Sequence, residues 1–186
     1  MLQIHIGSIT DKGLTVEEQV DAPALPLLHA VARDGSVNFT QPVQARIHAS
    51  LAEDTVSIDG RVGTTVRLFC SRCLAPFAYD IETDFSVTAM PETDSMAATG
   101  ASDDIELAAD EMNVIIYHGD SIDLGNEISQ QIIMALPFKP LCRETCKGLC
   151  TRCGADLNNG PCQCNIREKN NPFEVLKTRA FPKKKE

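Results

Sequence analysis

The chain has 186 residues, 43% of them apolar, so it is long enough to bury one sizeable core beside a smaller unit. Its formal net charge of −9 disfavours an extended contact with a nucleic-acid backbone, because phosphates repel an acidic surface. It contains no apolar run of about 18 residues or more and no basic and apolar secretory signal at its start, so we expect a cytoplasmic protein without a membrane contact.

Period-two alternation is the clearest pattern in the first half of the chain. The run 24–33 is only weakly patterned and predicts a short helix. The segments 43–51, 56–68 and 77–87 then alternate apolar and polar residues, which is typical of half-buried β-strands. Because they follow one another over short connections, they predict an antiparallel meander with one face in water.

The character of the chain changes at residues 91–111, which hold seven acids and no base. This composition favours a solvated acidic loop, with or without a short helix. The segment 112–117 predicts one more strand. The segment 123–136 predicts the main helix, because its apolar residues fall on one face, Ser121 or Asp123 can cap its start, and a proline follows it.

A polar, cysteine-rich stretch makes up the last quarter. Residues 140–186 hold ten Lys and Arg against five Asp and Glu, whereas 1–139 hold seven against twenty-one. The stretch is too poor in apolar residues to fold by burial alone. We therefore predict an α+β protein with two domains: a sheet and helix over 1–139, including the acidic loop 91–111, and a small zinc-binding module with a basic tail over 140–186.

Eight cysteines fall into four close pairs, and these are the candidate metal ligands. The pairs are Cys70 and Cys73, Cys142 and Cys146, Cys150 and Cys153, and Cys162 and Cys164. In a reducing compartment, close pairs are more typical of metal sites than of disulfides. The first pair lies between two predicted strands, where a tight turn lets two thiolates face one ion. Zinc takes four ligands in a tetrahedron, so we expect one or two structural zinc ions.

The pairing around each ion stays open at this point. The most local assignment joins the third and fourth pairs, although the eight residues between Cys153 and Cys162 are fewer than in common zinc ribbons. The first and second pairs would then form another site that clamps the tail onto the sheet. A rival assignment joins the second and third pairs and leaves Cys70 and Cys73 free to oxidise. Four cysteines also suit an iron–sulfur cluster.

Signs of catalysis are thin. The chain has no nucleophile elbow, phosphate-binding glycine loop or His-Glu-x-x-His motif, and its four histidines share no ligand spacing. Sites made only of cysteine are usually closed and structural. We therefore expect no catalytic residue and no enzyme. An open zinc site that activates water is the weakest alternative.

Four pieces of the chain, taken together, resemble a known family. They are Cys70-Ser-Arg-Cys73-Leu74 with Pro76 and Phe77; Ile122-Asp123-Leu124, then Ala135-Leu136-Pro137 and Pro140; Cys142 to Cys164 with Gly148-Leu149, Gly154 and Leu157-Asn158; and Asn171-Pro172-Phe173 with Leu176. The family is the YceD-like group of bacterial large-subunit ribosomal RNA accumulation proteins, which has relatives in plastids. The resemblance covers roughly residues 42–178, and its third piece is the specific one.

The resemblance implies a non-enzymatic role in ribosome biogenesis, in which large-subunit ribosomal RNA accumulates. The implied partners are ribosomal RNA, a ribosomal protein or an assembly factor of the large subunit. The acidic body suits a basic ribosomal protein by charge complementarity. Some members of the family lack much of the third piece, so a metal is not essential to the role they share. The alternative function is a redox- or zinc-responsive regulator that uses Cys70 and Cys73.

Overall fold

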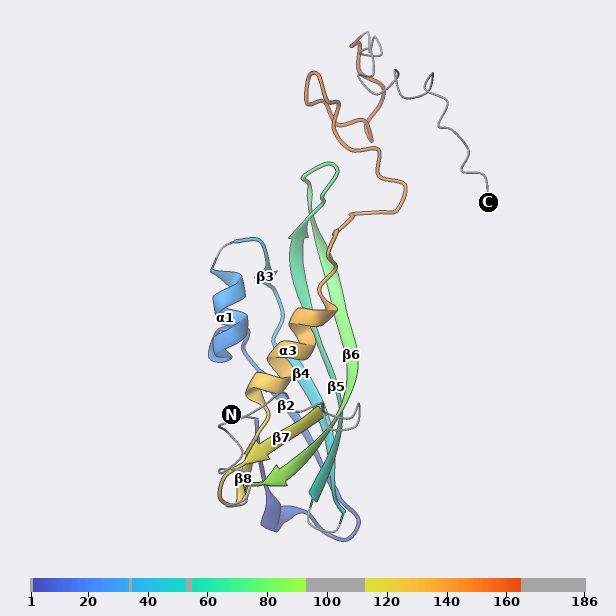
Figure 1. Cartoon of the computed structure of the whole chain (residues 1–186). Coiled ribbons are helices and arrows are strands. Elements are labelled where there is room, and N and C mark those ends of the chain that lie inside the picture. The colour runs from blue at the N-terminus through green and yellow to red at the C-terminus, as the bar shows by residue number, and fades with distance from the viewer. Residues whose placement is uncertain (1, 34, 53–54, 93–112, 165–186) are drawn as a thin grey trace, which may run out of the picture.

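A twisted sheet with helices on one face forms the body of the protein (Figure 1). The computed structural model describes residues 2–33, 35–52, 55–92 and 113–164. The strands are β1 (Gln3–His5), β2 (Leu14–Val20), β3 (Asn38–Phe39), β4 (Val43–Ala52), β5 (Thr55–Phe69), β6 (Pro76–Pro91), β7 (Val114–Tyr117) and β8 (Ser121–Asp123). The helices are α1 (Pro26–Ala32) and α3 (Gly125–Ala135), with short 3₁₀ turns η1 (Ile6–Ser8) and η2 (Ala22–Ala24).

The predicted meander is confirmed. β4, β5 and β6 pair antiparallel in sequence order, with Ile47 opposite Gly60 and Gly60 opposite Phe85. β5 has 15 residues and β6 has 16, so their hairpin projects well beyond the rest of the sheet (Figure 1). The turn at Cys70 and Cys73 lies at the tip of that projection, and the metal-ligand candidates that follow α3 lie near it.

The sheet is antiparallel, as predicted, except at the strand pair β6 and β7, so it is mixed. The six-stranded sheet has the order β2-β4-β5-β6-β7, with β3 on β5, and β7 pairs parallel to β6. A parallel partner needs a crossover rather than a tight turn, and periodicity carries no information on strand direction. β2 pairs with β4 but was not predicted, because Glu18 falls on its apolar side and breaks the alternation. β1 and β8 form a separate two-stranded ribbon.

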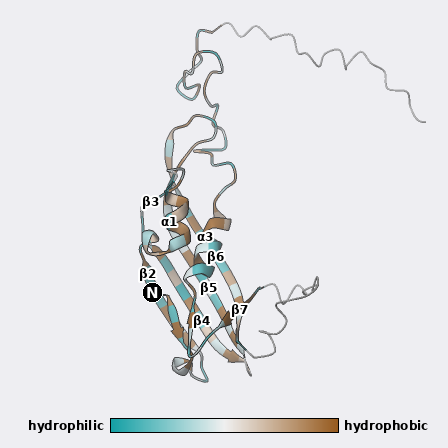
Figure 2. Cartoon of the chain, turned by 60° about the vertical axis from the view of Figure 1, so that its left-hand side comes forward, coloured by the Kyte–Doolittle hydropathy of each residue, from teal (hydrophilic) through white to brown (hydrophobic). Residues whose placement is uncertain are grey.

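Both helices pack on the apolar face of the sheet (Figures 1 and 2). Leu28 of α1 and Ile128 and Ile132 of α3 are fully buried with the inward side chains of β4, β5 and β6. α1 lies within the weak run 24–33, and α3 lies within the predicted helix 123–136. Ser121 and Asp123 both belong to β8, and Leu124 is the N-cap residue of α3. The Asp123 carboxylate still accepts a 2.9 Å hydrogen bond from the Gly125 amide at the start of the helix.

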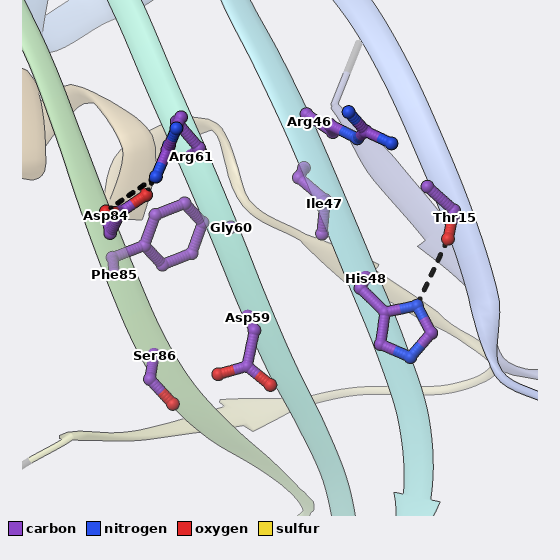
Figure 3. Close-up of a pocket in the computed structure, with 10 residues that line it drawn as sticks. All are labelled: Thr15, Arg46, Ile47, His48, Asp59, Gly60, Arg61, Asp84, Phe85 and Ser86. Atoms are coloured by element: carbon purple, nitrogen blue, oxygen red, sulfur yellow. Dashed lines mark hydrogen bonds and ion pairs between the residues drawn. The ribbon is translucent and has the colours of Figure 1, made fainter.

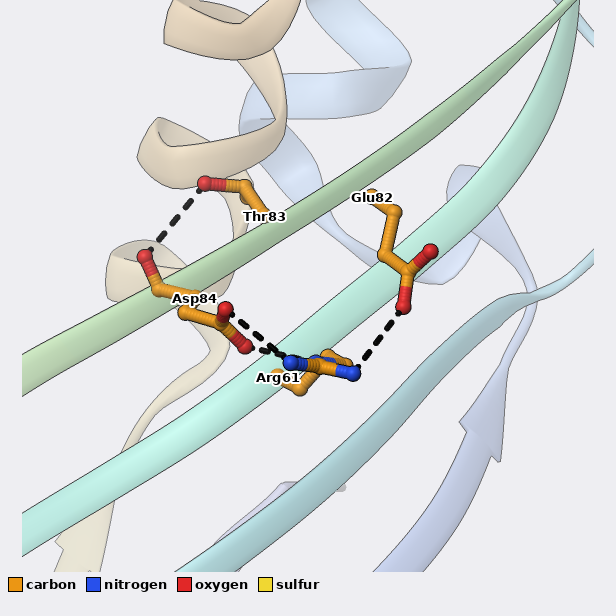
Figure 4. A network of polar contacts seen from close by, with 4 residues as sticks. All are labelled: Arg61, Glu82, Thr83 and Asp84. Carbon is orange, nitrogen blue, oxygen red and sulfur yellow. Dashed lines mark hydrogen bonds and ion pairs between the residues drawn. The ribbon is translucent and has the colours of Figure 1, made fainter.

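The opposite face of the sheet carries charged side chains. Arg61 lies between Asp84 and Glu82, with 2.6 Å from Nε to Asp84 Oδ1 and 3.4 Å from Nη1 to Glu82 Oε1 (Figure 4). A surface hollow lies beside this network (Figure 3). Two pairs of its polar side chains bind each other: Thr15 Oγ1 lies 3.1 Å from His48 Nδ1, and Arg61 is held by Asp84. Ile47, Gly60 and Phe85 also line the hollow, so polar and apolar groups share it.

Two predictions fall outside the described residues. The acidic segment 91–111 is described only at Pro91 and Glu92, and the basic tail after Cys164 is not described. The division into domains at residue 139 therefore stays a prediction. Within the four described ranges, no helix is both long and apolar enough to cross a membrane.

Candidate metal centres

The eight cysteines come together as two sets of four. Centre 1 joins Cys70 and Cys73, at the tip of the β5–β6 hairpin, to Cys142 and Cys146 beyond α3. Centre 2 joins the last four cysteines, Cys150, Cys153, Cys162 and Cys164. In each set all four sulfurs lie within 4.8 Å of one another. This grouping is the local assignment considered from the sequence, and the rival joining Cys142, Cys146, Cys150 and Cys153 is not adopted.

The spacing of the sulfurs suits one ion in each set. Four ligands at about 2.3 Å from a tetrahedral zinc lie about 3.8 Å from one another. In centre 1, Cys70 Sγ is 3.8 Å from Cys146 Sγ, and Cys73 Sγ is 3.7 Å from Cys142 Sγ. In centre 2, Cys162 Sγ is 3.3 Å from Cys150 Sγ. A disulfide would need about 2.05 Å, and all eight cysteines are free thiols. The residues present therefore fit a tetrahedral metal ion.

Each centre contains the same small turn. Cys70-Ser-Arg-Cys73 and Cys150-Thr-Arg-Cys153 both place an arginine amide on the sulfur two residues earlier, at 3.4 Å for Arg72 and 3.5 Å for Arg152. In both turns the amide of the first cysteine donates to the alanine carbonyl five residues on, at 3.0 Å and 2.8 Å. Such a turn directs N–H groups at a thiolate and so supports a metal ligand.

A left-handed residue closes each turn. Gly154 has φ +73°, as its place after Cys153 predicts. Leu74 occupies the equivalent place after Cys73 with φ +60°, and among the described residues it is the one non-glycine with positive φ. The amides of both donate to the carbonyl of the first cysteine, at 2.9 Å in each turn. The first turn thus keeps the left-handed backbone conformation although leucine disfavours it.

Arg72 fastens the segment that carries Cys142 and Cys146 to the hairpin. Its Nη1 donates to the carbonyls of Glu144 and Cys146, at 3.0 Å and 2.8 Å. The Arg72 carbonyl in turn accepts from the Leu149 amide at 3.1 Å. Because one residue of the turn satisfies backbone groups on both sides of Cys146, it fixes where the tail crosses the hairpin tip.

Asn158 joins the two centres. It lies between Cys153 and Cys162 in the sequence of centre 2, but its Nδ2 donates to Cys146 Sγ of centre 1 at 3.5 Å. Its Oδ1 accepts from the Lys147 amide at 2.9 Å. The Leu157 amide also donates to the Gly148 carbonyl at 2.9 Å. The segment 154–161 therefore braces both centres rather than only linking two ligand pairs.

Burial differs between the ligands. Cys70, Cys73 and Cys146 form a small buried cluster, flanked by Phe77, Leu141, Cys142 and Leu149. Cys150 is also buried, whereas Cys153 is exposed. Phe77 contacts both this cluster and the main core, so the hairpin links the two. A buried set of four thiols with amide donors around it is typical of a structural site rather than a reactive one.

The thiol pKa values are split within each set. Amide donors, first that of Cys142, lower the pKa of Cys70 to about 6, and the amides of Cys153 and Arg152 lower the pKa of Cys150 to about 6. Burial raises the pKa of Cys142 to about 12, and the neighbouring Cys153 thiol, first through its hydrogen bond, raises that of Cys164 to about 12. Crowded thiolates repel one another, so a cation among them is what would allow all four to ionise.

Three supporting residues escaped the sequence analysis: Arg72, Gly148 and Asn158. The repeated Cys-x-Arg-Cys spacing could have pointed to Arg72. Gly148 has φ +75°, which a glycine between two ligand pairs could have suggested. Asn158 belongs to the third piece of the family resemblance, but its contact with Cys146 could not be predicted, because that contact depends on how the chain folds back.

Comparison with known proteins identifies relatives. The family model described as large ribosomal RNA subunit accumulation protein YceD matches residues 58–178. A Mycobacterium tuberculosis protein named only as uncharacterized is 28% identical over 138 residues, which is 72% of this chain and 62% of that protein. No solved structure matches the chain.

Two plant relatives carry a more informative name. Both are called large ribosomal RNA subunit accumulation protein YCED homolog 1, chloroplastic. The Arabidopsis thaliana protein is 25% identical over 73% of this chain and 47% of its own length, and the Zea mays protein is 26% identical over 68% and 50%. The chain therefore spans about half to three-fifths of the relatives it matches. Since the family model matches residues 58–178, which is most of the chain and includes all eight cysteines of the two centres, the chain belongs to the YceD family of large ribosomal RNA subunit accumulation proteins.

Proposed function

We propose that this chain is a non-enzymatic factor in large-subunit ribosomal RNA accumulation whose C-terminal part is folded by two structural zinc ions. Membership of the family carries the first half of the proposal. The two tetracysteine centres carry the second half. The chain would act in a compartment that keeps thiols reduced, such as the bacterial cytoplasm, because disulfides would dismantle both centres.

Zinc is the metal that best fits the ligands. Four thiolates around one point suit a single tetrahedral ion, and zinc in such sites is redox-inert and structural. An iron–sulfur cluster would place its cysteines around several iron and sulfide atoms, which calls for a wider spacing than the 3.7–3.8 Å of centre 1. Cys70, Cys73, Cys142 and Cys146 would hold one ion, and Cys150, Cys153, Cys162 and Cys164 the other.

The composition of the centres supports a non-catalytic role. A catalytic zinc keeps one coordination position for water or substrate, whereas four cysteines complete the tetrahedron. In centre 1 the sulfurs of Cys70, Cys73 and Cys146 are buried, so a substrate has little access to the ion. The zinc would therefore hold the tail on the hairpin tip and shape a binding surface.

Charge favours a basic protein as the direct partner over ribosomal RNA. Each closed site of four thiolates and one dication adds −2, so two sites move the formal charge of the chain from −9 to about −13. A polyanion of this size repels phosphate at long range. It attracts basic proteins, which include most proteins that bind RNA backbone. The chain would thus promote ribosomal RNA accumulation through a basic protein of the large subunit.

Depletion of the protein in its own host tests the role. We expect a lower ratio of large- to small-subunit ribosomal RNA and fewer free large subunits on a sucrose gradient. A copy that carries Cys142→Ser should restore the ratio only in part, because centre 1 would lose one ligand. Unchanged ribosomal RNA and unchanged subunit profiles after depletion would contradict the proposal.

The regulatory alternative has weaker support. Amide donors that lower the pKa of Cys70 favour its reactive thiolate. However, Cys70 is 0% exposed and Cys73 is 8% exposed, and both belong to centre 1, so an oxidant reaches them poorly. Counting free thiols before and after mild peroxide treatment of the metal-loaded protein distinguishes the two. Reversible loss of two thiols from Cys70 and Cys73 would favour the regulator.

A further inference from the structure

One side of β6 has no strand partner over most of its length. β5 pairs with β6 from Pro76 to Ala89, whereas β7 pairs only with residues 88–91 on the other side. Among the residues that the structure describes, no backbone group of other elements bonds to residues 77–87 on that side. At about 3.3 Å per residue this open edge is roughly 35 Å long. Figure 1 shows β6 along the outer border of the sheet.

The register identifies the backbone groups that face outward. In an antiparallel pair, residues alternate between pointing at the partner and pointing away. The Cys70 amide bonds to Ala75 across the hairpin, so the even residues of β5 and the odd residues of β6 face each other. The Glu92 amide bonds to Tyr117 on the β7 side, which places the even residues of β6 at the other edge. The outward residues are Ala78, Asp80, Glu82, Asp84 and Ser86.

Nothing in β6 itself blocks this edge. The register with β5 stays continuous from Pro76 to Ala89, so no bulge turns the edge away. The only prolines of the strand are at its two ends, Pro76 and Pro91. The five outward residues are all exposed. Natural sheets usually shield an edge of this length with lysine, proline, a bulge or a covering loop, so an edge left regular is suited to strand addition.

An acidic row borders the edge and indicates the chemistry of the partner. Asp80, Glu82 and Asp84 have side chains on the same face and backbone groups at the edge. Arg61 is shared by Glu82 and Asp84 (Figure 4), and its own side chain is 60% exposed. Asp80 accepts a 2.7 Å hydrogen bond from Thr65 Oγ1, and it forms no ion pair with the residues that the structure describes. Asp59 and Arg67 of β5 lie opposite Ser86 and Ala78 and are also exposed on this face, so four carboxylates against two guanidinium groups leave this border negative.

We propose that the open edge of β6 binds an extended, lysine- or arginine-rich segment of a partner protein as an added β-strand. The backbone of the segment pairs with the even residues of β6, and its cationic side chains lie over the acidic row. This inference rests on the proposed function and extends it by naming the surface and the chemistry of the partner.

The same features disfavour the other occupants. A second copy of β6 would bring its own Asp80, Glu82 and Asp84 against this row, and like charges on neighbouring strands repel. RNA would bring phosphates to the row, with the same result. The charge pattern therefore selects against both, and a basic segment is the occupant it favours.

A labelled twelve-residue peptide in which lysine alternates with valine provides the probe. We expect the full-length, zinc-loaded protein to bind it in fluorescence anisotropy at physiological salt. The same peptide with N-methyl groups on every amide keeps its charge but cannot donate to a strand. N-methylation should weaken binding at least about tenfold, which corresponds to about 1.4 kcal/mol. Equal binding of the two peptides would show adsorption by charge alone and would overturn the proposal.

Glu82→Pro tests the edge on the protein side. The Glu82 amide faces outward, so proline there removes an edge donor without removing a bond to β5. We expect peptide binding to fall at least about tenfold, with the circular dichroism of the sheet unchanged. Glu82→Lys keeps the amide but reverses the charge, and it should also weaken binding. This variant tests the edge even if the proline variant folds poorly. Glu17→Gln removes an exposed charge on β2 of the same face and is the control.

Three further outcomes would overturn the inference: no binding of the parent peptide, normal binding by both Glu82 variants, or a dimer in solution that Glu82→Pro dissolves. The cellular readout separates this inference from the proposed function. If depletion lowers large-subunit ribosomal RNA but Glu82→Pro restores it fully, the inference fails and the function stands. If depletion has no effect, the function itself fails, whatever the peptide does.

Discussion

Gly148 and Arg72 approach each other so closely that a side chain on Gly148 would press on the Arg72 backbone. A Cβ on Gly148 would lie 3.0 Å from the Arg72 carbonyl oxygen, and the φ of Gly148 is +75°. The next residue, Leu149, donates its amide to that same carbonyl. The tail thus crosses the hairpin tip backbone to backbone, at the point where centre 1 meets centre 2.

Replacement of Gly148 by alanine should therefore weaken both centres. Gly154→Ala is the matched control, because Gly154 also has positive φ, at +73°, but has no atom within 4 Å of a Cβ. We expect Gly154→Ala to cost about 1 kcal/mol from the left-handed backbone alone. Gly148→Ala should cost roughly twice that or more, because the new methyl group also pushes on a backbone oxygen. Denaturant unfolding of the zinc-loaded proteins measures the difference, and equal costs would contradict the close approach.

Asn158→Ala should lower the metal affinity of centre 1, although Asn158 lies among the ligands of centre 2. Its Nδ2 donates to Cys146 Sγ, and loss of such a partner typically costs 10–100-fold in affinity. Asn159→Ala is the control, because Asn159 Nδ2 contacts only Asp156, at 3.3 Å. Competition with a zinc-binding dye gives the two affinities. A Cys142→Ser background isolates the metal affinity of centre 2. If Asn158→Ala lowers only that affinity, Asn158 does not link the two centres.

Sequence patterns predicted the parts of the fold in which one side of an element is buried. β4, β5, β6 and α3 were found because their apolar residues recur at the period of the element. The parallel direction of β7 could not be found, because strand direction depends on the path of the connection. β2 was missed because Glu18 falls where the pattern requires an apolar residue.

The candidate site was likewise predictable only where its residues recur at short spacings. The four cysteine pairs and the turn at Cys70 were readable, because metal ligands recur at short fixed spacings. The grouping of the pairs remained open, since it depends on where the tail returns to the hairpin. Arg72 and Asn158 act on carbonyls and a sulfur that are distant in the sequence. The repeated Cys-x-Arg-Cys spacing marks the position of Arg72, but neither distant partner can be found from a local pattern.

Leu74→Gly should stabilise the hairpin tip. Leu74 has φ +60°, a conformation that costs a residue with a Cβ about 1–2 kcal/mol, and its side chain is 63% exposed, so little burial is lost. After the entropic cost of glycine, we expect a gain of about 0.5–1 kcal/mol. Glycine already occupies the equivalent position in centre 2, at residue 154. A lower midpoint in denaturant unfolding would mean that the Leu74 side chain has a structural contact of its own.

Gly60→Ala should destabilise the middle of the sheet. A Cβ on Gly60 would overlap Cε1 of the Phe85 ring, which covers this glycine from the neighbouring strand. The overlap should cost about 1–3 kcal/mol. Phe85→Leu in the same chain frees the space, so the double variant should lose less than the sum of the two single losses. Gly7→Ala, with no atom within 4 Å of its Cβ, is the control and should change little.

Removal of the metal should release the tail and leave the body folded. The buried cysteines of centre 1 form a cluster separate from the main core, where Leu28, Ile128 and Ile132 pack without any metal ligand. The zinc-loaded protein should hold two ions with all eight thiols protected, and a strong chelator should expose all eight. Because protons compete with zinc for thiolates, metal should also be lost as the pH falls. Hydrogen exchange should then rise in residues 140–164 and at the hairpin tip, but stay slow in β4, β5 and α3.

The cysteine variants assign each ion in this experiment. Cys142→Ser should leave one ion in centre 2, and Cys164→Ser should leave one in centre 1, as native mass spectrometry would count them. Because Asn158 links the centres, each single variant should also lower the metal affinity of the intact centre. This loss should be smaller than the loss of affinity at the centre that carries the substitution. Loss of both ions in either variant would mean that the two centres form one unit that folds only when both are filled. Retention of both ions in either variant would rule out the assignment of that cysteine as an essential ligand.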